Sequence, residues 1–184
     1  APLVSMPPSR SSKTPTDAAV DPKLLLGAAV EIERDLSILT GVELAAKYNG
    51  KRAAAFERVV GKPVDIVAGE HNPFWHYILQ TWYKQPQYRA LLHPPRHRDE
   101  LARAVVLMAT GQLDLYDGIH HQYPRRALKS FFMKMMVDWL PKRHKLVDNL
   151  DILVLYSHNR EDRAKAAIES VKNMNRHNAY IRKH

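Results

Sequence analysis

The chain has 184 residues, and its 45% hydrophobic and 26% charged residues are typical of one folded domain, or of one domain with a long arm. It contains no Cys, which excludes disulfides, thiolate metal sites and a Cys nucleophile. Its 28 Lys and Arg against 19 Asp and Glu give a net charge of +9, which favours an anionic partner such as RNA, acidic lipid or an acidic protein face.

Residues 1–20 are rich in Pro, Ser and Thr, and they hold too few apolar side chains to offset the entropy of ordering the segment. We therefore expect a disordered or partner-bound arm. The chain starts at Ala1 rather than Met, which is consistent with removal of a targeting segment. No run of about 18 apolar residues occurs, so we expect no segment that spans a bilayer by itself.

Residues 21–70 are expected to form an N-terminal helical extension. Asp21 before Pro22 is a typical helix start, and apolar residues then recur at helical spacing. Thr40 and Glu43 have the spacing of a capping box, which predicts a second helix. The rest of the extension is expected to comprise a short helix over 51–60 and an extended connection over 61–69.

Residues 71–184 are expected to form a helical domain. Asn72 before Pro73 repeats the helix-start signature, and an aromatic-rich helix follows. Aromatic side chains at helical spacing pack in a core or at a subunit interface, and base stacking or contact with a quinone is the alternative. The aromatics of this helix are Phe74, Trp75, Tyr77, Trp82 and Tyr83.

Two more helices are predicted in the middle of this domain. The first opens with Asp99 and Glu100, since acidic side chains favour the positive end of the helix dipole, and it ends at Gly111. The second spans 123–139, and Pro141 is predicted to stop it because proline disrupts a helix interior. Its apolar side carries Leu128, Phe131, Phe132, Met135 and Trp139.

Beyond Pro141 the pattern is ambiguous. Residues 142–156 are compatible with a continued helix, whereas the run 152–156 is also compatible with a strand; helix is favoured because no partner strand is evident. Asn159 is expected to cap a last helix, before a polar and basic tail from residue 175. Together these elements predict an all-α fold, with several amphipathic helices in a loosely globular bundle and an extended N-terminal arm.

No pattern of residues indicates catalysis or metal binding. His93 and His97 are four residues apart, but Pro94 and Pro95 prevent the helix that would align them on one face. The sequence has no Gly-rich phosphate loop, no Gly-x-Ser-x-Gly turn and no closely paired carboxylates beside a base. We therefore expect no catalytic, cofactor-binding or metal-binding residues, and we do not expect an enzyme.

Polar clusters allow other roles. Because histidine in general titrates near neutral pH, His120 and His121 beside Asp117 are candidates for passing protons, or they are polar residues in a turn. Basic clusters are candidates for contacts with RNA phosphates, lipid head groups or acidic subunits. These clusters are Arg96 with Arg98, Arg125 with Arg126, Lys142 with Arg143 and Lys145, and the C-terminal tail.

A set of short elements follows in order between Trp75 and Arg163: Trp82-Tyr83, Leu91-Leu92, residues 98–108, Leu115-Tyr116-Asp117, Arg126-Ala127-Leu128 and Leu140-Pro141. This order resembles subunit 7 of the mitochondrial cytochrome bc1 complex, its matrix-side all-helical, ubiquinol-binding-protein-like subunit. The chain departs from the family at Gly118 and His120-His121, where the family has Arg, and it lacks the family's Pro within 152–156.

The resemblance implies a non-catalytic structural and assembly subunit of respiratory complex III, the ubiquinol–cytochrome c oxidoreductase of mitochondrial electron transport. Such a subunit lies on the matrix side of the inner membrane, peripheral to the bilayer. Its expected partners are cytochrome b, the core subunits and other complex III subunits, with cardiolipin as a candidate lipid and no nucleic acid. The chain would bind no cofactor itself, since the haem and the iron–sulfur cluster belong to partner subunits.

The same resemblance implies which residues meet other subunits. His120, His121 and Arg126 would lie near the quinone-reduction side of cytochrome b, where lipid contact or a proton path is a hypothesis for them. The alternative interpretation of the sequence is a basic mitochondrial ribosomal protein that binds rRNA. The expected interface residues are Trp75, Trp82, Tyr83, Tyr116, Asp117, Arg125, Arg126, Phe131, Phe132, Met135 and Trp139.

Overall fold

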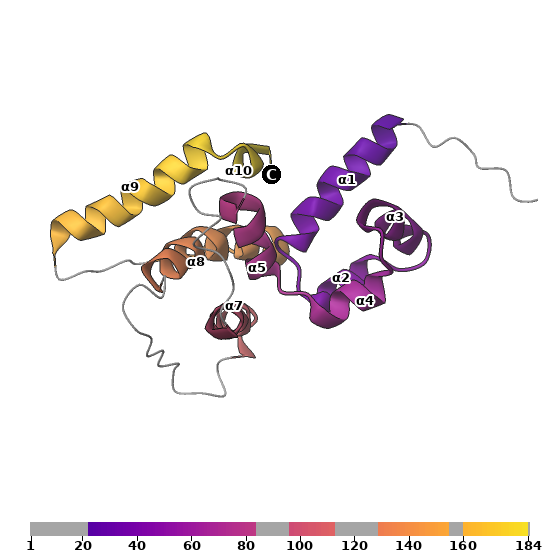
Figure 1. The fold of residues 1–184 in the computed structure, drawn as a ribbon, viewed down its shortest axis with the longest axis horizontal. Coiled ribbons are helices and arrows are strands. Elements are labelled where there is room, and N and C mark those ends of the chain that lie inside the picture. Colours follow the sequence, from indigo (N-terminus) through magenta and orange to yellow (C-terminus); the bar gives the residue numbers. More distant parts are fainter. Residues whose placement is uncertain (1–21, 84–95, 113–128, 155–159, 184) are drawn as a thin grey trace, which may run out of the picture.

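The structure, a computed structural model, describes residues 22–83, 96–112, 129–154 and 160–183. Every regular element in these ranges is a helix, which confirms the predicted all-α fold (Figure 1). The arm predicted for residues 1–20 lies outside them.

The first helices pack around a small core of their own. α1 and α3 lie side by side, and α2 lies against α4 (Figure 1). Each helix buries only the face on which its apolar residues recur. The group comprises α1 (Pro22–Leu36), α2 (Gly41–Lys47), α3 (Lys51–Val60) and α4 (Val64–Glu70). Its buried residues are Ile32, Leu36, Leu44, Tyr48, Phe56 and Val64.

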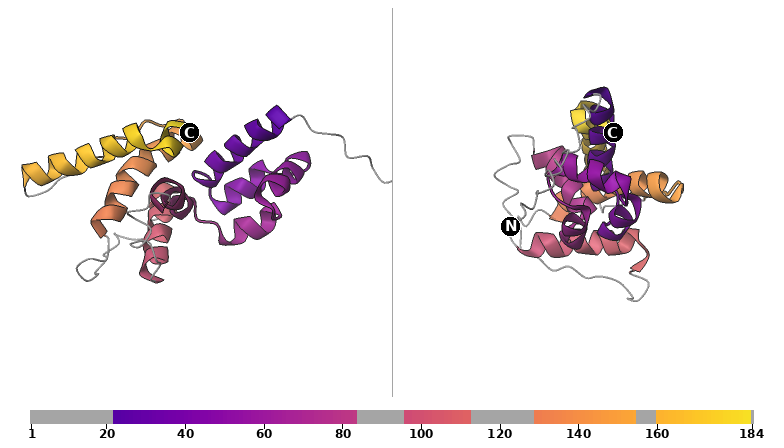
Figure 2. Two further views of the ribbon diagram at one scale, coloured as in Figure 1. Left: turned by 45° about the horizontal axis from the view of Figure 1, so that its top comes forward. Right: turned by 90° about the vertical axis from the view of Figure 1, so that its right-hand side faces the viewer.

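The later helices surround a second, larger core. The group comprises α5 (Pro73–Ile78), the π-helical turn η1 (Leu79–Tyr83), α7 (Arg96–Ala109), α8 (Lys129–Arg143), the π-helical turn η3 (His144–Asp148), α9 (Glu161–His177) and α10 (Ala179–Lys183). α5 contacts α7 and α8, and α9 also contacts α8 (Figures 1 and 2). Aromatic rings fill the centre of this core, with Phe74 lying 5.2 Å from Trp139 between ring centroids.

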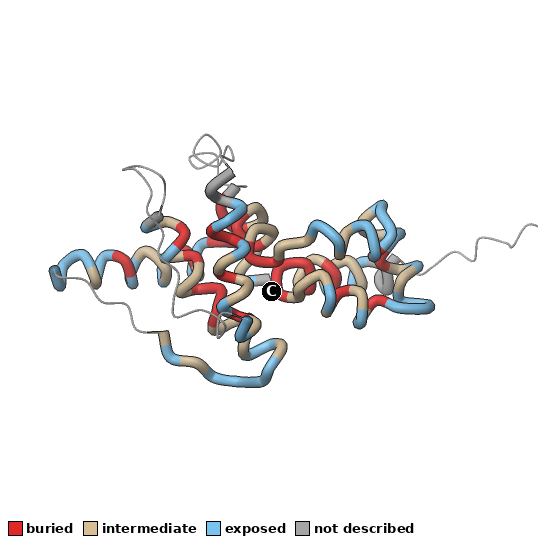
Figure 3. Tube along the Cα trace, turned by 90° about the horizontal axis from the view of Figure 1, so that it is seen from below, coloured by how far each residue is buried: buried red, intermediate tan, exposed pale blue. Residues whose placement is uncertain are grey.

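The two groups of helices meet where α1 ends. Ile38, in the turn after α1, belongs to the second core, and Leu39 packs against both. Buried residues gather around this junction, whereas the outer faces of α3 and α9 are largely exposed (Figure 3). Two cores joined in this way do not by themselves define two domains, so the division predicted at residue 70 stays a prediction.

The local signals for helix starts are confirmed at two positions. In the capping box of α2, the Glu43 backbone N–H donates to Thr40 Oγ1 at 3.4 Å, and the Thr40 N–H donates to Glu43 Oε2 at 2.7 Å. At the start of α5, the Trp75 N–H donates to Asn72 Oδ1 at 2.9 Å. These signals are reliable because they satisfy backbone N–H groups that have no partner inside the helix.

The extended connection predicted over 61–69 is wrong, because residues from Val64 onward form α4. The sequence offers this helix no side-chain cap, and a helix of seven residues is not stable on its own. Packing decides the outcome: Val64 is buried, and α4 crosses α2 at close range. Gly41 makes that approach possible, since a Cβ there would lie 2.0 Å from the Ala68 carbonyl oxygen.

The helix stop predicted at Pro141 is also wrong. α8 extends to Arg143 and η3 continues to Asp148, after which Asn149 ends the helical stretch in the left-handed region, with φ of 52°. A proline inside a helix costs about 3 kcal/mol. The buried side chains of Trp139 and Arg143, one before the proline and one after it, hold the backbone helical despite that cost.

The end of the chain differs from expectation in two further ways. Residues 152–154 are neither helix nor strand, so both interpretations of that run are wrong for its described part. The N-cap of α9 is Arg160 rather than Asn159, although Glu161 and Asp162 occupy the first turn as predicted. The segment expected to be a polar tail is largely helical, since α9 continues to His177 and α10 follows.

We predict that Gly41→Ala lowers the free energy of unfolding by about 1–3 kcal/mol, because the added methyl group must push α4 away from α2. The matched control is Gly27→Ala in α1, where an added Cβ meets nothing within 4 Å. That change should stabilise the protein by about 0.5–1 kcal/mol, as alanine does at exposed helix positions. Chemical denaturation measures both, and equal effects of the two substitutions would contradict the α2–α4 contact.

Candidate functional site

Side chains from distant parts of the sequence converge on the end of α1. The last carbonyl groups of a helix have no partner within it, and buried carbonyls need one. His71 Nε2 bonds the Leu36 carbonyl oxygen at 2.7 Å, and Trp139 Nε1 donates to that of Ser37 at 2.7 Å. The Arg143 guanidinium donates to the Ile38 carbonyl oxygen at 2.6 Å. We call residues 33–38 the α1 terminus.

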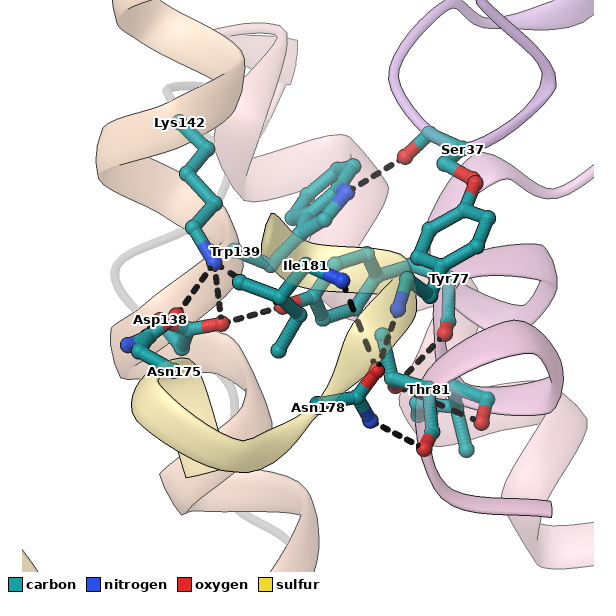
Figure 4. Close-up of polar contacts among 11 residues, drawn as sticks. Ser37, Tyr77, Thr81, Asp138, Trp139, Lys142, Asn175, Asn178 and Ile181 are labelled. Carbon is teal, nitrogen blue, oxygen red and sulfur yellow. Dashed lines mark hydrogen bonds and ion pairs between the residues drawn. The ribbon is translucent and has the colours of Figure 1, made fainter. Parts of the chain in front are cut away.

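Helix α10 covers the same terminus from another side. The Tyr180 hydroxyl contacts Ser37 Oγ and donates to the Glu33 carbonyl oxygen at 3.1 Å. Burial raises the pKa of Tyr180 to about 12, so its phenol stays protonated at neutral pH. Asn178 positions the start of α10, because its side chain accepts from the Tyr180 N–H at 2.9 Å and donates to the Thr81 carbonyl (Figure 4).

Arg143 is the only fully buried arginine among the residues whose exposure is described, at 2% exposed. Its two terminal nitrogens lie 3.1 and 2.9 Å from the two carboxylate oxygens of Glu43, a bidentate pair. Burial alone would raise the pKa of Glu43, but hydrogen bonds from Arg143 and Thr40 outweigh it and hold that pKa below its ordinary value. The Glu43 carboxylate thus caps α2 and also neutralises the charge of Arg143 on α8.

A second polar cluster lies beside the first, between α5, α8 and α9 (Figure 4). Lys142 Nζ lies 2.8 Å from Asp138 Oδ2, 2.8 Å from Asn175 Oδ1 and 3.2 Å from the Tyr77 hydroxyl. The Tyr77 hydroxyl also donates to Asp138. Burial, then the Asp138 charge, raises the pKa of Tyr77 well above its ordinary value. The phenol therefore stays protonated, and all three Lys142 donors are occupied.

A cleft of about 470 Å³ lies between the α1 terminus, α8 and α10. Tyr77, Lys142 and Tyr180 contribute to its inner wall, next to the polar clusters described above. We call it the α1–α8 cleft. The lining also includes the apolar residues Ile38, Pro141, Leu146 and Ile181. Two further cationic residues, Arg34 and Lys145, belong to it as well.

Of the residues expected at a subunit interface, those whose side chains the structure describes lie in the chain's own core or pack against it. Met135 and Trp139 are fully enclosed, and Phe132 is 2% exposed. Trp75 is half-buried and stacks on Phe132, with ring centroids 6.2 Å apart. Trp82 is buried with its ring edge-on to Phe131, at 4.8 Å. These residues pack the helices of the core against one another. Contact of Phe131 or Trp75 with a partner stays a prediction.

The other expected site residues cannot be placed. The side chain of Tyr83 and residues Tyr116, Asp117, His120, His121, Arg125 and Arg126 lie outside what the structure describes. For Arg143 the phosphate contact considered from the sequence is wrong, because its guanidinium is buried against Glu43 and the Ile38 carbonyl.

Sequence reasoning did not find His71, Ser37, Tyr180 or the Glu43–Arg143 pair. A side-chain donor to a helix end can come from anywhere in the chain, so the spacing of residues carries no signal for it. Only His71 had a local signal for a fixed position: it directly precedes the predicted helix start at Asn72.

Comparison with protein-family models, curated proteins and solved structures gave no match. In the described ranges, no group of three or more His, Cys, Asp or Glu side chains is arranged to hold a metal ion. None of the helices described is long and apolar enough to cross a membrane.

We predict that Arg143→Met lowers the free energy of unfolding by about 3 kcal/mol or more, because it leaves Glu43 and a buried carbonyl without their partner. Lys165→Met is the control: Lys165 pairs with Glu161 on the exposed surface of α9, with side-chain exposures of 73% and 80%. That change should cost well under about 1 kcal/mol. A similar loss in both variants, measured by chemical denaturation, would show that Arg143 does not link the helices.

Stability should also depend on pH through His71. Burial lowers the pKa of His71 despite its bond to the Leu36 carbonyl, so the unfolded chain binds the proton more readily than the folded one. Stability should therefore be full above about pH 6.5 and decline as the pH falls below that value. His71→Gln, which keeps a donor, should show a shallower decline. Parallel stability profiles between pH 7.5 and 5.5 would contradict this role.

Proposed function

We propose that the chain is a non-catalytic structural subunit of mitochondrial respiratory complex III, packed against cytochrome b and the core subunits on the matrix side of the inner membrane. The ordered elements from Trp82-Tyr83 to Leu140-Pro141 support the choice of complex III. The structure supports the more general part of the proposal, that this chain has a surface for a larger partner.

The observation that carries this proposal is a run of exposed leucines after α8. Leu146, Leu150 and Leu153 are 52%, 56% and 85% exposed. Single exposed leucines are common, but from three within one short segment we infer an apolar surface of the kind that partners cover. Full burial of a leucine side chain contributes about 1.5–3 kcal/mol, so covering them would stabilise an assembly substantially.

The segment that carries these leucines is suited to docking. It leaves the helical stretch at Asn149 and continues without regular structure through residue 154. Its acidic side chain, Asp151, is paired locally, since Lys145 Nζ lies 2.9 Å from Asp151 Oδ2. An apolar partner surface would therefore leave no charge of this pair unpaired. This is the surface that we assign to a neighbouring subunit.

The test is recovery of the tagged chain from mitochondria solubilised in digitonin, with companions identified by mass spectrometry. We expect cytochrome b, the core subunits and the iron–sulfur subunit. The double variant Leu150→Asp/Leu153→Asp should lose these companions, because it places two charges in the interface, whereas Leu150→Met/Leu153→Met should retain them.

Other results would overturn the proposal. Ribosomal proteins and RNA as companions would indicate the rRNA-binding alternative, and their loss at high salt would identify the basic clusters as the contact. Retention of complex III subunits by both double variants would show that the leucine segment is not the interface.

A further inference from the structure

We propose that the α1–α8 cleft binds a single-chain anionic amphiphile, that is, an alkyl or acyl chain with one carboxylate or phosphate head group. The chain would lie against Ile38, Leu146 and Ile181, and the head group would meet Arg34 and Lys145. This site shares Leu146 and Lys145 with the segment proposed above as an interface, but it does not depend on complex III.

The size and lining of the cleft suit such a ligand. Its volume of about 470 Å³ lies within the range of about 300–1,000 Å³ found for small-molecule sites, which are mostly apolar with a few polar groups. Its lining joins aliphatic side chains from the α1 terminus, η3 and α10 with the side chains of Tyr77 and Tyr180. A flexible alkyl chain can follow such a surface without requiring polar partners.

The inner polar groups are already satisfied by the protein. Lys142 uses its three donors on Asp138, Asn175 and Tyr77, and the Tyr77 hydroxyl donates to Asp138. The Tyr180 hydroxyl is engaged with Ser37 and the Glu33 carbonyl. A polar ligand group placed there would displace an existing hydrogen bond. The inner part of the cleft therefore favours the apolar part of a ligand.

The exposed charges favour an anion. The charged residues of the lining are three cations, Arg34, Lys142 and Lys145, and one acid, Asp151. Arg34 forms a long ion pair with Asp35, at 3.8 Å, and the Asp35 carboxylate also accepts from Tyr48 and Lys47. Lys145 pairs with Asp151 in an exposed bridge, which holds it only weakly. Both cations can turn to a head group at little cost.

Calorimetric titration of the purified chain with dodecanoate, below its micellar concentration, tests the site directly. We expect saturable one-to-one binding, and decanoate should bind about fourfold more weakly for each methylene removed. Dodecylamine, with the same chain and the opposite charge, should bind at least about tenfold more weakly than dodecanoate. Dodecyl phosphate distinguishes the two head groups: whichever of the two anions binds more tightly identifies the natural chemistry.

Two pairs of variants locate the ligand. Leu146→Glu places an acid in the wall and should reduce dodecanoate affinity about tenfold or more, while Leu153→Glu on the same segment, outside the lining, should leave it unchanged. Arg34→Gln should weaken binding of both anions, and Arg103→Gln on the exposed face of α7 should not. Circular dichroism verifies the fold of each variant.

The wild-type titrations decide the proposal even if a variant fails to fold. Absence of saturable binding, equal affinity for dodecylamine and dodecanoate, or no dependence on chain length would overturn it. An equal loss of affinity in folded Leu146→Glu and Leu153→Glu variants would also overturn it, because binding would then follow general surface charge rather than the cleft.

Discussion

The carbonyl groups at the end of α1 need hydrogen-bond donors that α1 itself does not supply. Carbonyl oxygens turned away from water need donors, and here the donors are His71 after α4, and Trp139 and Arg143 on α8. Tyr180 adds a bond from α10. Because these donors belong to different helices, meeting the requirement fixes the positions of α4, α8 and α10 around one point. The rest of the architecture follows from that junction.

The same junction explains two features that are unfavourable by themselves, the burial of Arg143 and the position of Pro141. Arg143 is a buried charge, but Glu43 neutralises it and at the same time caps α2. Pro141 lies inside a helix, yet the residues on both sides of it are held by Ser37 and Ile38. Such a burial cost is reduced when the charged group has partners with good geometry, as both terminal nitrogens of Arg143 have, although its buried Nε has no partner among the described residues. The junction therefore links the two cores more firmly than apolar contact alone would.

The surfaces with functional potential lie next to this rigid centre. The α1–α8 cleft is bounded by the α1 terminus and by α8, so its shape depends on the hydrogen bonds that place them. The leucine segment continues from η3, and its first leucine, Leu146, also lines the cleft. A binding surface stays complementary to its ligand or partner when rigid elements support it.

The sequence by itself determined the fold class and the starts of α2 and α5. Proline after Asn72, the capping box of Thr40 and Glu43, and the apolar spacing act within a few residues, so they can be recognised without a structure. The sequence also placed Phe132, Met135 and Trp139 on one side of a helix, but it assigned them to a subunit interface, whereas the structure encloses them in the chain's own core. Tertiary structure alone decided that α4 is a helix, that α8 passes through Pro141, and that Arg143 is buried rather than available to phosphate. The physical reason is that these outcomes depend on contacts between residues far apart in the chain, such as Gly41 with Ala68 and Glu43 with Arg143, whose energies exceed the local preferences.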